Sequence, residues 1–338
     1  MNSFGRIFRV HIFGESHGEC VGLTIDGCPA GLPLSVEDFT TDIERRKPGA
    51  LGTTPRKEDD TPQVKTGLFN GKTTGAPLTI LFENKNTRST DYEKQRAVPR
   101  PGHADFVAAK KFGGFEDYRG SGHFSGRLTV CLVAAGVIAK KILPPPPPEG
   151  GTGVSITSRI IEIGGETDLD KGLQKAMDAK DTIGGIIECK VTGLPIGLGE
   201  PFFDSAESLI AHAVFAIPAV RGVEFGTGFA AAKMFGSQHN DSIEDKTGKT
   251  FTNHAGGIVG GLTNGNELVF RIAIKPTSST PKEQQTLNTE TGNVESFSVK
   301  GRHDLCIALR VPVVLEAVTA FVLADLMLLE QKVPRIIY

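Results

Sequence analysis

The sequence predicts a mixed α and β protein, and three of its features carry this prediction. Short runs that alternate apolar and polar residues between glycines and prolines, at residues 7–13, 21–27 and 61–84, are typical of β-strands. Two long apolar stretches, residues 128–143 and 313–331, favour helices that bury most of their surface. The 41 glycines in the 338 residues are clustered, which indicates many tight turns or points of close approach to a ligand.

The N-terminal elements follow from local patterns. Residues 7–13 and 21–27 predict strands on either side of the loop GESHG. Residues 34–47 predict a helix, because Ser35 can cap it and its early acidic and late basic residues suit the helix dipole. Pro48 and the glycine after it end this helix. The alternation over residues 61–84 predicts a hairpin or meander, and the polar segment 84–106 is long enough to be a functional loop.

Helices are predicted next at residues 104–112 and 128–143. The five consecutive prolines that follow cannot form helix or paired strand, so residues 144–153 are either a domain linker or a surface loop. Strands and helices then alternate up to residue 235. The clearest are a strand at residues 184–193 and a helix at 207–217, and after the glycine-rich loop NHAGGIVGGLTNG come a strand that starts at residue 267 and the apolar helix 313–331.

Composition excludes several classes of protein. A net charge of −2 gives no basic excess, so we expect no nucleic-acid partner. The five cysteines are scattered without a C-x-x-C pair, which argues against disulfides and a zinc site and for a reducing compartment. The first residues lack an apolar signal core, and the longest apolar run, near residues 128–139, is too short to span a bilayer. We therefore expect a cytoplasmic protein with no membrane partner and no metal.

Four polar loops hold most of the groups that could carry chemistry: FGESHG, RPGHADF, YRGSGHFSGR and GRHD. Each contains a histidine beside an arginine, a serine or a carboxylate. Arginine binds oxyanions with two parallel hydrogen bonds, and histidine exchanges protons near neutral pH. A fifth loop, KPTSST, adds a lysine and hydroxyls but lacks the spacing of an ATP-binding loop, and GGIVGG lacks that of a dinucleotide site. These residues predict an enzyme that handles a phosphorylated or carboxylated small molecule.

The loop GESHG also matches G-x-S-x-G, the nucleophile elbow of serine hydrolases, which would make Ser16 a nucleophile. That elbow needs a strand, a sharp turn and a helix, with an oxyanion-hole loop earlier in the chain. Only 13 residues precede Gly14, so the hydrolase hypothesis is the weaker one. A third hypothesis is a catalytically silent module that binds a nucleotide or a flavin.

Taken in order, the segments FGESHG, RRKPG, RPGHAD, DYRGSGHFSGR, GLGEPFFD, GSQHND, NHAGGIVGG, KPTSS and GRHD resemble the chorismate synthase family from residue 3 to about residue 329. The resemblance implies one large α+β domain over residues 1–338, with helices sandwiched between antiparallel sheets and residues 144–153 as a surface loop. It also implies a homotetramer. The implied reaction is the 1,4-anti elimination of phosphate from 5-enolpyruvylshikimate-3-phosphate to give chorismate, with reduced FMN and no net redox change.

The resemblance also implies the site residues. The catalytic residues are His17, which protonates the departing phosphate, His103, beside the flavin, and Asp304, which helps to pass on the C6 proton of the substrate. The substrate-binding residues are Arg46, Arg100, Ser125, Arg127 and Arg302. The flavin-binding residues are His123, Phe124, Ser125, Ala219, Gly260, Lys275, Pro276, Thr277, Ser278, Ser279 and Arg302. The sequence shows no appended reductase domain, so reduced flavin is expected from an external source and NADPH alone should not support turnover.

The chain departs from the family pattern at a few positions. Where the family commonly has G-G-R-S-S-A-R-E-T, this chain has His123 for the first arginine, Phe124 for a serine and Leu128 for the glutamate. Pro218 stands where asparagine is common, and a basic residue usual before TTPR is absent. An imidazole is shorter than a guanidinium and charged only below its pKa. His123 therefore either contacts an anion, with binding that weakens as the pH rises, or packs beside Phe124 as a structural residue.

Overall fold

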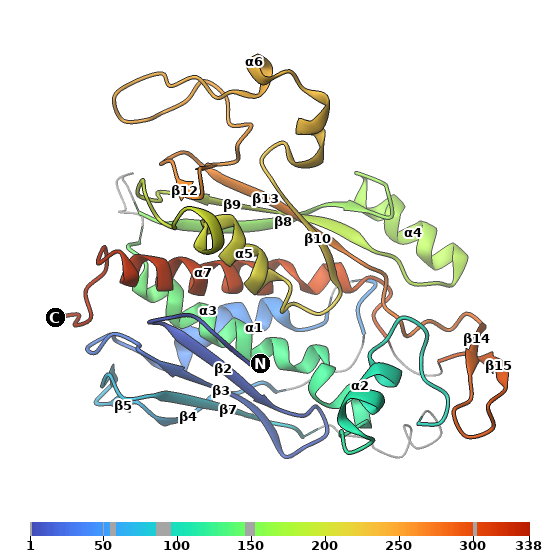
Figure 1. The fold of residues 1–338 in the computed structure, drawn as a ribbon. Helices are drawn as coiled ribbons and strands as arrows, with labels where there is room; N and C mark the ends of the chain where they lie inside the picture. The colour runs from blue at the N-terminus through green and yellow to red at the C-terminus, as the bar shows by residue number, and fades with distance from the viewer. Residues whose placement is uncertain (1, 50, 55–58, 86–95, 146–152, 300–302) are drawn as a thin grey trace.

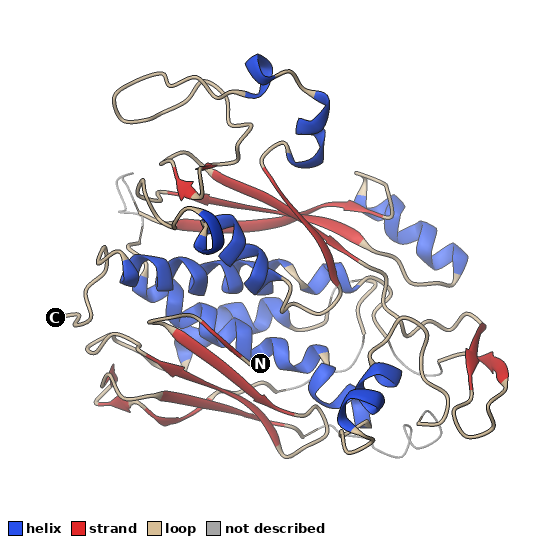
Figure 2. Cartoon of the chain, in the orientation of Figure 1, coloured by secondary structure: helices blue, strands red, loops and turns tan. Residues whose placement is uncertain are grey.

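A layer of helices lies between two antiparallel β-sheets, as Figure 2 shows. The arrangement is that of a computed structural model, which describes residues 2–49, 51–54, 59–85, 96–145, 153–299 and 303–338. The expected α+β sandwich is therefore confirmed. One hydrophobic core contains side chains from both sheets and from the helices between them.

The first sheet has the strand order β1-β2-β3-β7-β4. Its strands are Ser3–Phe4 (β1), Arg9–Gly14 (β2), Cys20–Asp26 (β3), Leu78–Glu83 (β7) and Gln63–Thr66 (β4). Strands β2 and β3 pair in antiparallel register, with Gly14 opposite Val21, so the GESHG loop joins two strands as predicted. A small hairpin, Leu68–Phe69 (β5) and Lys72–Thr73 (β6), completes the predicted meander.

The second sheet has the order β10-β13-β9-β8 and is also antiparallel. Its strands are Val220–Phe225 (β10), Leu268–Ile274 (β13), Gly185–Thr192 (β9) and Ser155–Ile163 (β8). Two further hairpins pair Ile258–Val259 (β11) with Leu262–Thr263 (β12) and Gln284–Leu287 (β14) with Val294–Phe297 (β15). The β14–β15 hairpin was not predicted, because its strands are short, exposed and polar and carry no apolar alternation.

The helices between the sheets are Thr40–Arg46 (α1), Thr129–Ile142 (α3), Ala206–Val214 (α5) and Pro312–Leu329 (α7), and Figure 1 shows α3 and α7 running the length of this layer. Outside it lie Asp105–Phe112 (α2), Leu169–Ala179 (α4) and Gly236–His239 (α6). Helix α1 follows a 3₁₀ turn at Glu37–Phe39 (η1). The predicted Ser35 side-chain cap is wrong: Val36 holds the cap position, and the backbone N–H of Ser35 donates to the carboxylate of Asp38 at 2.8 Å.

Helix α7 is buried on every face, since all residues from Val313 to Leu328 are buried. Its two carboxylates tie the layers together. Glu316 accepts hydrogen bonds from both terminal guanidinium nitrogens of Arg45 on α1, each at 2.7 Å. Asp325 accepts hydrogen bonds from three consecutive backbone N–H groups, those of residues 6–8 before β2. Buried carboxylates are tolerated because each oxygen is hydrogen-bonded.

The expectation that the longest apolar run lies near residues 128–139 and is too short to span a bilayer is corrected by the length and hydropathy of two segments. Among the residues that the structure describes, two segments, Arg119–Ile142 and Pro312–Leu329, could cross a membrane by length and hydropathy, but 72% and 89% of their most apolar windows are buried inside the protein. The core helices α3 and α7 make up most of these segments. Beyond α3, the backbone N–H of Val154 donates to the carbonyl of Pro144 at 2.7 Å. Residues 146–152 of the proline-rich segment lie outside the described residues.

The contact between α3 and α7 depends on Gly136, because a Cβ at this position would overlap the backbone and Cβ of Ala317. We predict that Gly136→Ala destabilises the fold by about 1–3 kcal/mol through overpacking, despite a gain of about 1 kcal/mol in helix propensity. Urea unfolding measures this. Gly236→Ala in the short helix α6 is the control, since nothing lies within 4 Å of its Cβ position and it should be neutral or slightly stabilising. Equal stability of both variants would contradict the close α3–α7 packing.

Candidate active site

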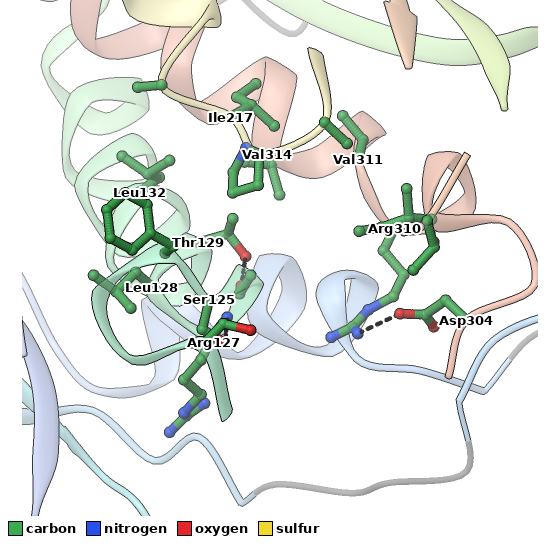
Figure 3. A pocket seen from close by; sticks show the side chains of 18 of the residues that line it. Ser125, Arg127, Leu128, Thr129, Leu132, Ile217, Asp304, Arg310, Val311 and Val314 are labelled. Carbon is green, nitrogen blue, oxygen red and sulfur yellow. Dashed lines mark hydrogen bonds and ion pairs between the residues drawn. The ribbon is translucent and has the colours of Figure 1, made fainter. Parts of the chain in front are cut away.

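A cavity of about 750 Å³ opens between the two sheets, beside the start of α7. Figure 3 shows its apolar wall, with Leu132, Ile217 and Val314, and its polar side, with Arg127 and Arg310. Six cationic side chains and two carboxylates are among its described lining residues: Arg46, Lys47, Arg100, Arg127, Lys275, Arg310, Asp60 and Asp304. In a protein of net charge −2, this concentration of positive charge marks a site for an anion.

The cavity brings together most of the predicted site residues, although they come from distant parts of the chain. Those that line it are Arg46, Arg100, His103, His123, Phe124, Ser125, Arg127, Ala219, Lys275, Pro276, Thr277, Ser278, Ser279 and Asp304. Two predicted residues do not line it. Gly260 lies in the turn between β11 and β12, and His17 lies behind the cavity wall. Arg302 lies outside the described residues.

His103 is held by a charged cluster at the start of α2. Its Nδ1 lies 2.5 Å from Oδ1 of Asp105, which also accepts two parallel hydrogen bonds from Arg100 at 2.8 Å. Because a carboxylate only accepts, Nδ1 carries the proton and the lone pair of the neutral ring is on Nε2. Burial would raise the pKa of Asp105, but hydrogen bonds from Arg100 and His103 outweigh it and hold that pKa well below its usual range. Asp105 therefore fixes both the tautomer and the position of His103.

Arg100 also reaches across the cavity wall. Its guanidinium donates to the hydroxyl of Ser279 at 3.0 Å and to that of Ser121 at 2.9 Å. Nearby, Lys275 donates to the Ser278 hydroxyl at 2.7 Å and to the Gly102 carbonyl at 3.1 Å, and burial lowers the pKa of this lysine. Hydrogen bonds donated by the charged side chains of Arg100 and Lys275 thus join the loop that follows β13 to the loop before α2.

A second cluster lines the same cavity, where Arg46 and Arg127 share the buried carboxylate of Asp60. Arg46 also donates to the hydroxyl of Thr129 at 2.9 Å and to the carbonyls of Gly126 and Arg127. Burial and the neighbouring charges of Arg310 and Arg127 lower the pKa of Arg46 to about 10, against the opposing pull of Asp60. Arg46 therefore stays charged at neutral pH.

Asp304 is fixed between a backbone donor and a side-chain cation. The N–H of Thr54 donates to Oδ1 of Asp304 at 2.8 Å, and a guanidinium nitrogen of Arg310 lies 3.4 Å from Oδ2, the pair marked in Figure 3. Arg310 is the last residue of the 3₁₀ turn Ile307–Arg310 (η8), and its Nε donates to the backbone carbonyl of Arg46. This contact links the second cluster to Asp304.

The GESHG loop does not form a nucleophile elbow. It joins strand β2 to strand β3, and no helix follows. Ser16 is 3% exposed, and its hydroxyl donates to the carbonyl of Gly120 at 2.7 Å. His17 packs against the same glycine, since a Cβ at Gly120 would overlap the imidazole. Ser16 is therefore a structural hydroxyl, which contradicts the serine hydrolase hypothesis.

His123 contacts the N-terminal strands from the turn Arg119–Phe124 (η4). Its Nδ1 lies 3.1 Å from the carbonyl of Gly14, so this nitrogen must be a donor, and its Nε2 lies 3.2 Å from the side-chain oxygen of Asn2. The ring centroids of His123 and Phe124 are 6.4 Å apart. Of the two hypotheses for His123, these contacts favour the structural one.

Four further residues belong to the site but were not predicted: Asp60, Asp105, Ser121 and Arg310. Asp105 and Ser121 lie inside two of the quoted loops, so proximity to His103 and His123 in the sequence could have found them. Asp60 and Arg310 have no such signal, because only the folded chain brings them to the cavity. Among the described residues, no group of three histidine, cysteine or acidic side chains could hold a metal ion.

The fold and the cavity define an α+β protein built to bind a small molecule with several negative charges. The chain matches the chorismate synthase family over residues 8–328. It is 70% identical to the chorismate synthase of Chitinophaga pinensis over 336 residues, which cover 99% of each protein. It is 43% identical to that of Dehalococcoides mccartyi over 366 aligned residues, with 99% of each covered. A crystal structure of a chorismate synthase matches with a TM-score of 0.71 at 25% identity, covering 96% of this chain and 93% of that one. The chain therefore belongs to the chorismate synthase family of lyases.

The Arg100–Asp105 pair makes a pH-dependent contribution to stability. Because the pKa of Asp105 is lower in the folded protein, its contribution is complete above the unfolded value of about 4 and is lost as the pH falls from there towards the folded pKa. We predict that Asp105→Asn costs about 3 kcal/mol at pH 7, where it leaves Arg100 without a carboxylate, and less as the pH falls below about 4.

Urea unfolding of wild type and variant between pH 3 and pH 7 measures this difference. Asp178→Asn, which changes an exposed carboxylate on α4, is the control and should have little effect at any pH. If Asp105→Asn lowers the free energy of unfolding by the same amount at pH 3 and pH 7, the charged Arg100–Asp105 pair does not contribute to stability as proposed.

Proposed function

We propose that this protein eliminates phosphate from 5-enolpyruvylshikimate-3-phosphate to give chorismate, with reduced FMN as the cofactor. The observation that carries the proposal is one cavity lined both by six cationic side chains and by two acid–base groups, His103 and Asp304. A phosphate ester with additional carboxylates needs several strong donors, and guanidinium groups supply them. Membership of the chorismate synthase family points to the same reaction.

The residues present fit a flavin. A flat ring system needs an apolar wall, which Ile217, Val311 and Val314 supply, and its phosphate needs donors such as Lys275 and Ser278. The side chains predicted from the family that line the cavity and would hold FMN are Phe124, Ser125, Ala219, Lys275, Pro276, Thr277, Ser278 and Ser279, whereas His123 lines the cavity but contacts Gly14 and Asn2 through its ring nitrogens. When bound, reduced FMN supplies an electron-rich ring beside the substrate, and the reaction leaves its oxidation state unchanged.

The chain's own residues then bind and move protons. Arg46, Arg100 and Arg127 hold the substrate's phosphate and carboxylates. In the elimination the C–O bond to phosphate and the C6–H bond break, and the ring gains a double bond. Asp304 is fixed by Thr54 and Arg310 with its carboxylate at the cavity, where it takes part in removing the C6 proton.

The two histidines have different positions with respect to this chemistry. His103 lines the cavity with Nδ1 held by Asp105, so its other nitrogen is the one that can exchange a proton with a ligand. His17 lies behind Gly120, one layer from the cavity. Its assignment as the acid for the leaving phosphate rests on the family resemblance, and a separate variant has to test it.

The alternative of a silent flavin-binding module has less support. The changes at His123 and Phe124 leave His103 and Asp304 in the cavity with their positioning partners. A module that only binds a ligand has no need for a histidine whose tautomer is fixed by a charged cluster. The enzyme hypothesis explains this cluster, and the binding module does not.

The proposal extends to the assembly and the surroundings of the protein. A homotetramer is supported by apolar side chains on residues 226–256, which extend away from the second sheet at the top of Figure 1: Phe229 is 84% exposed, Phe235 77%, Ile243 71% and Phe251 70%. A reducing, cytoplasmic location is supported by five free cysteines. An external source of reduced flavin is supported by the glycine-rich loop near residue 260, which is a hairpin and not a dinucleotide site.

Turnover should require reduced FMN. We predict chorismate formation under anaerobic conditions with chemically reduced FMN, and none with oxidised FMN and NADPH, because the described chain contains no dinucleotide-binding loop. Chorismate absorbance and phosphate release measure the reaction. Sustained aerobic turnover with FMN and NADPH and no added reductase would contradict the external source, and no turnover under either condition would contradict the proposed function.

Loss of the acid–base groups should act on rate more than on binding. We predict that His103→Ala and His17→Ala each lower kcat about 10²–10⁴-fold, the usual contribution of such groups, while KM changes far less. His239→Ala, in the short helix α6 away from the cavity, is the control and should keep wild-type rates. A variant at either site that turns over at close to the wild-type rate would remove that histidine from the mechanism.

A further inference from the structure

Asp60 is the shared partner of the two arginines on one side of the cavity. Its side chain is 1% exposed, its Oδ2 accepts a hydrogen bond from Arg46 at 3.1 Å, and its Oδ1 accepts one from Arg127. Asp60 also lines the cavity. A buried carboxylate between two cations that face a ligand site affects both the geometry of those cations and the charge that a ligand meets.

The other contacts of the two guanidinium groups are neutral. Arg46 donates to the hydroxyl of Thr129 and to two backbone carbonyls. Arg127 donates to the side-chain oxygen of Asn84 at 2.9 Å and to the carbonyl of Glu83. Among the described residues, Asp60 is therefore the one carboxylate that either arginine contacts, and two positive charges share one negative charge.

This arrangement leaves donors for a ligand. Each guanidinium has five N–H groups. The described partners engage four of those on Arg46 and three of those on Arg127. Arg310, whose Nε contacts the carbonyl of Arg46, adds a further positive charge at the same place. An anion that enters here meets preorganised donors and a net positive charge.

We propose that Asp60 is a positioning residue that holds Arg46 and Arg127 ready for the phosphate or carboxylate of the ligand and limits how tightly that anion binds. The inference rests on the proposed function only in taking the anion to be part of the substrate. Asp60 repels the anion that its two partners attract. It therefore lowers the affinity of the site for the anion, while it fixes the geometry of the two arginines and makes the release of phosphate easier.

The test compares Asp60→Asn with a matched control. Asn keeps the shape of the side chain and tolerates the left-handed backbone at Asp60, where φ is 54°. Asp42→Asn removes another largely buried aspartate that lies between two cations, Arg45 at 3.0 Å and Lys140 at 2.7 Å, but does not line the cavity. Both variants lose a buried ion pair, and only Asp60→Asn changes the charge that a ligand meets.

The probe is inorganic phosphate at pH 7 and constant ionic strength, with binding measured by calorimetry and by the shift in unfolding temperature. We expect both variants to unfold at lower temperature than wild type without phosphate. Asp60→Asn should bind phosphate about tenfold more tightly than wild type, because one like charge near the anion has been removed, and should regain more of its unfolding temperature. Asp42→Asn should bind phosphate as wild type does.

Turnover supplies a second readout that a purely structural role would not change. Asp60→Asn should lower kcat about 10–100-fold without raising KM, since binding strengthens while the two arginines lose their common anchor. Asp60→Glu keeps the charge and should retain the wild-type phosphate affinity within about threefold. If Asp60→Asn does not stay folded in buffer alone, its recovery by refolding in phosphate, compared with matched chloride, gives the same comparison.

The outcomes separate the inference from the proposed function. The inference would be overturned, and the proposed function left intact, if phosphate raised the unfolding temperatures of wild type and Asp60→Asn equally. In that case Asp60→Asn and Asp60→Glu would also bind phosphate with the same affinity. Phosphate that binds neither protein, together with no turnover by wild type, would overturn both. If Asp60→Asn alone binds phosphate more tightly and the wild-type protein shows no turnover, the result would support the anion site and contradict the proposed reaction.

Discussion

The architecture depends on one helix that has no face for solvent. Because α7 is apolar all round, it is stable only where other elements cover every side, and two sheets with α1, α3 and α5 provide that cover. Its carboxylates lock the position: Glu316 fixes α1, and Asp325 fixes the segment before β2. The cavity lies where α7 begins, between Asp304 and the apolar residues Val311 and Val314. A helix N-terminus carries partial positive charge, which adds to that of the arginines.

Burial of so many cations is possible because each has protein acceptors. Arg100 pairs with Asp105, Arg46 and Arg127 share Asp60, and Arg310 lies near Asp304. These partners have two consequences. They satisfy the desolvated guanidinium groups without a ligand, and they fix the orientations of these groups at the cavity. The carboxylates near the cavity therefore determine the positions of the arginines beside them.

Much of the fold could be predicted from the sequence, because apolar periodicity and the glycine and proline positions act locally. The strands around the GESHG loop, the helix at residues 128–143 and the strand at 184–193 all occur within a few residues of the expected bounds. Local patterns did not find the polar hairpin β14–β15. They also placed the start of the first helix at residue 34, whereas the helical segment begins with η1 at Glu37. The resemblance in ordered motifs supplied the sandwich, which local patterns cannot give.

The site was predictable only in part for the same reason. The arginines and His103 stand out because they lie in segments that match the family's motifs. Asp60 and Arg310 do not, since their importance comes from contacts with residues far away in the sequence, such as Arg127 and Asp304. The position of His17 behind Gly120 was also not visible, because sequence order says nothing about which side of a loop faces the cavity.

The most direct test of the central claim, that this cavity binds the anionic substrate, is a crystal structure of the protein with FMN and 5-enolpyruvylshikimate-3-phosphate. The account predicts the flavin ring against Ile217 and Val314, and the substrate's phosphate and carboxylates within hydrogen-bond distance of Arg100 and Arg127. Substrate bound elsewhere on the protein, with the Arg46–Asp60–Arg127 cluster facing only solvent, would contradict it.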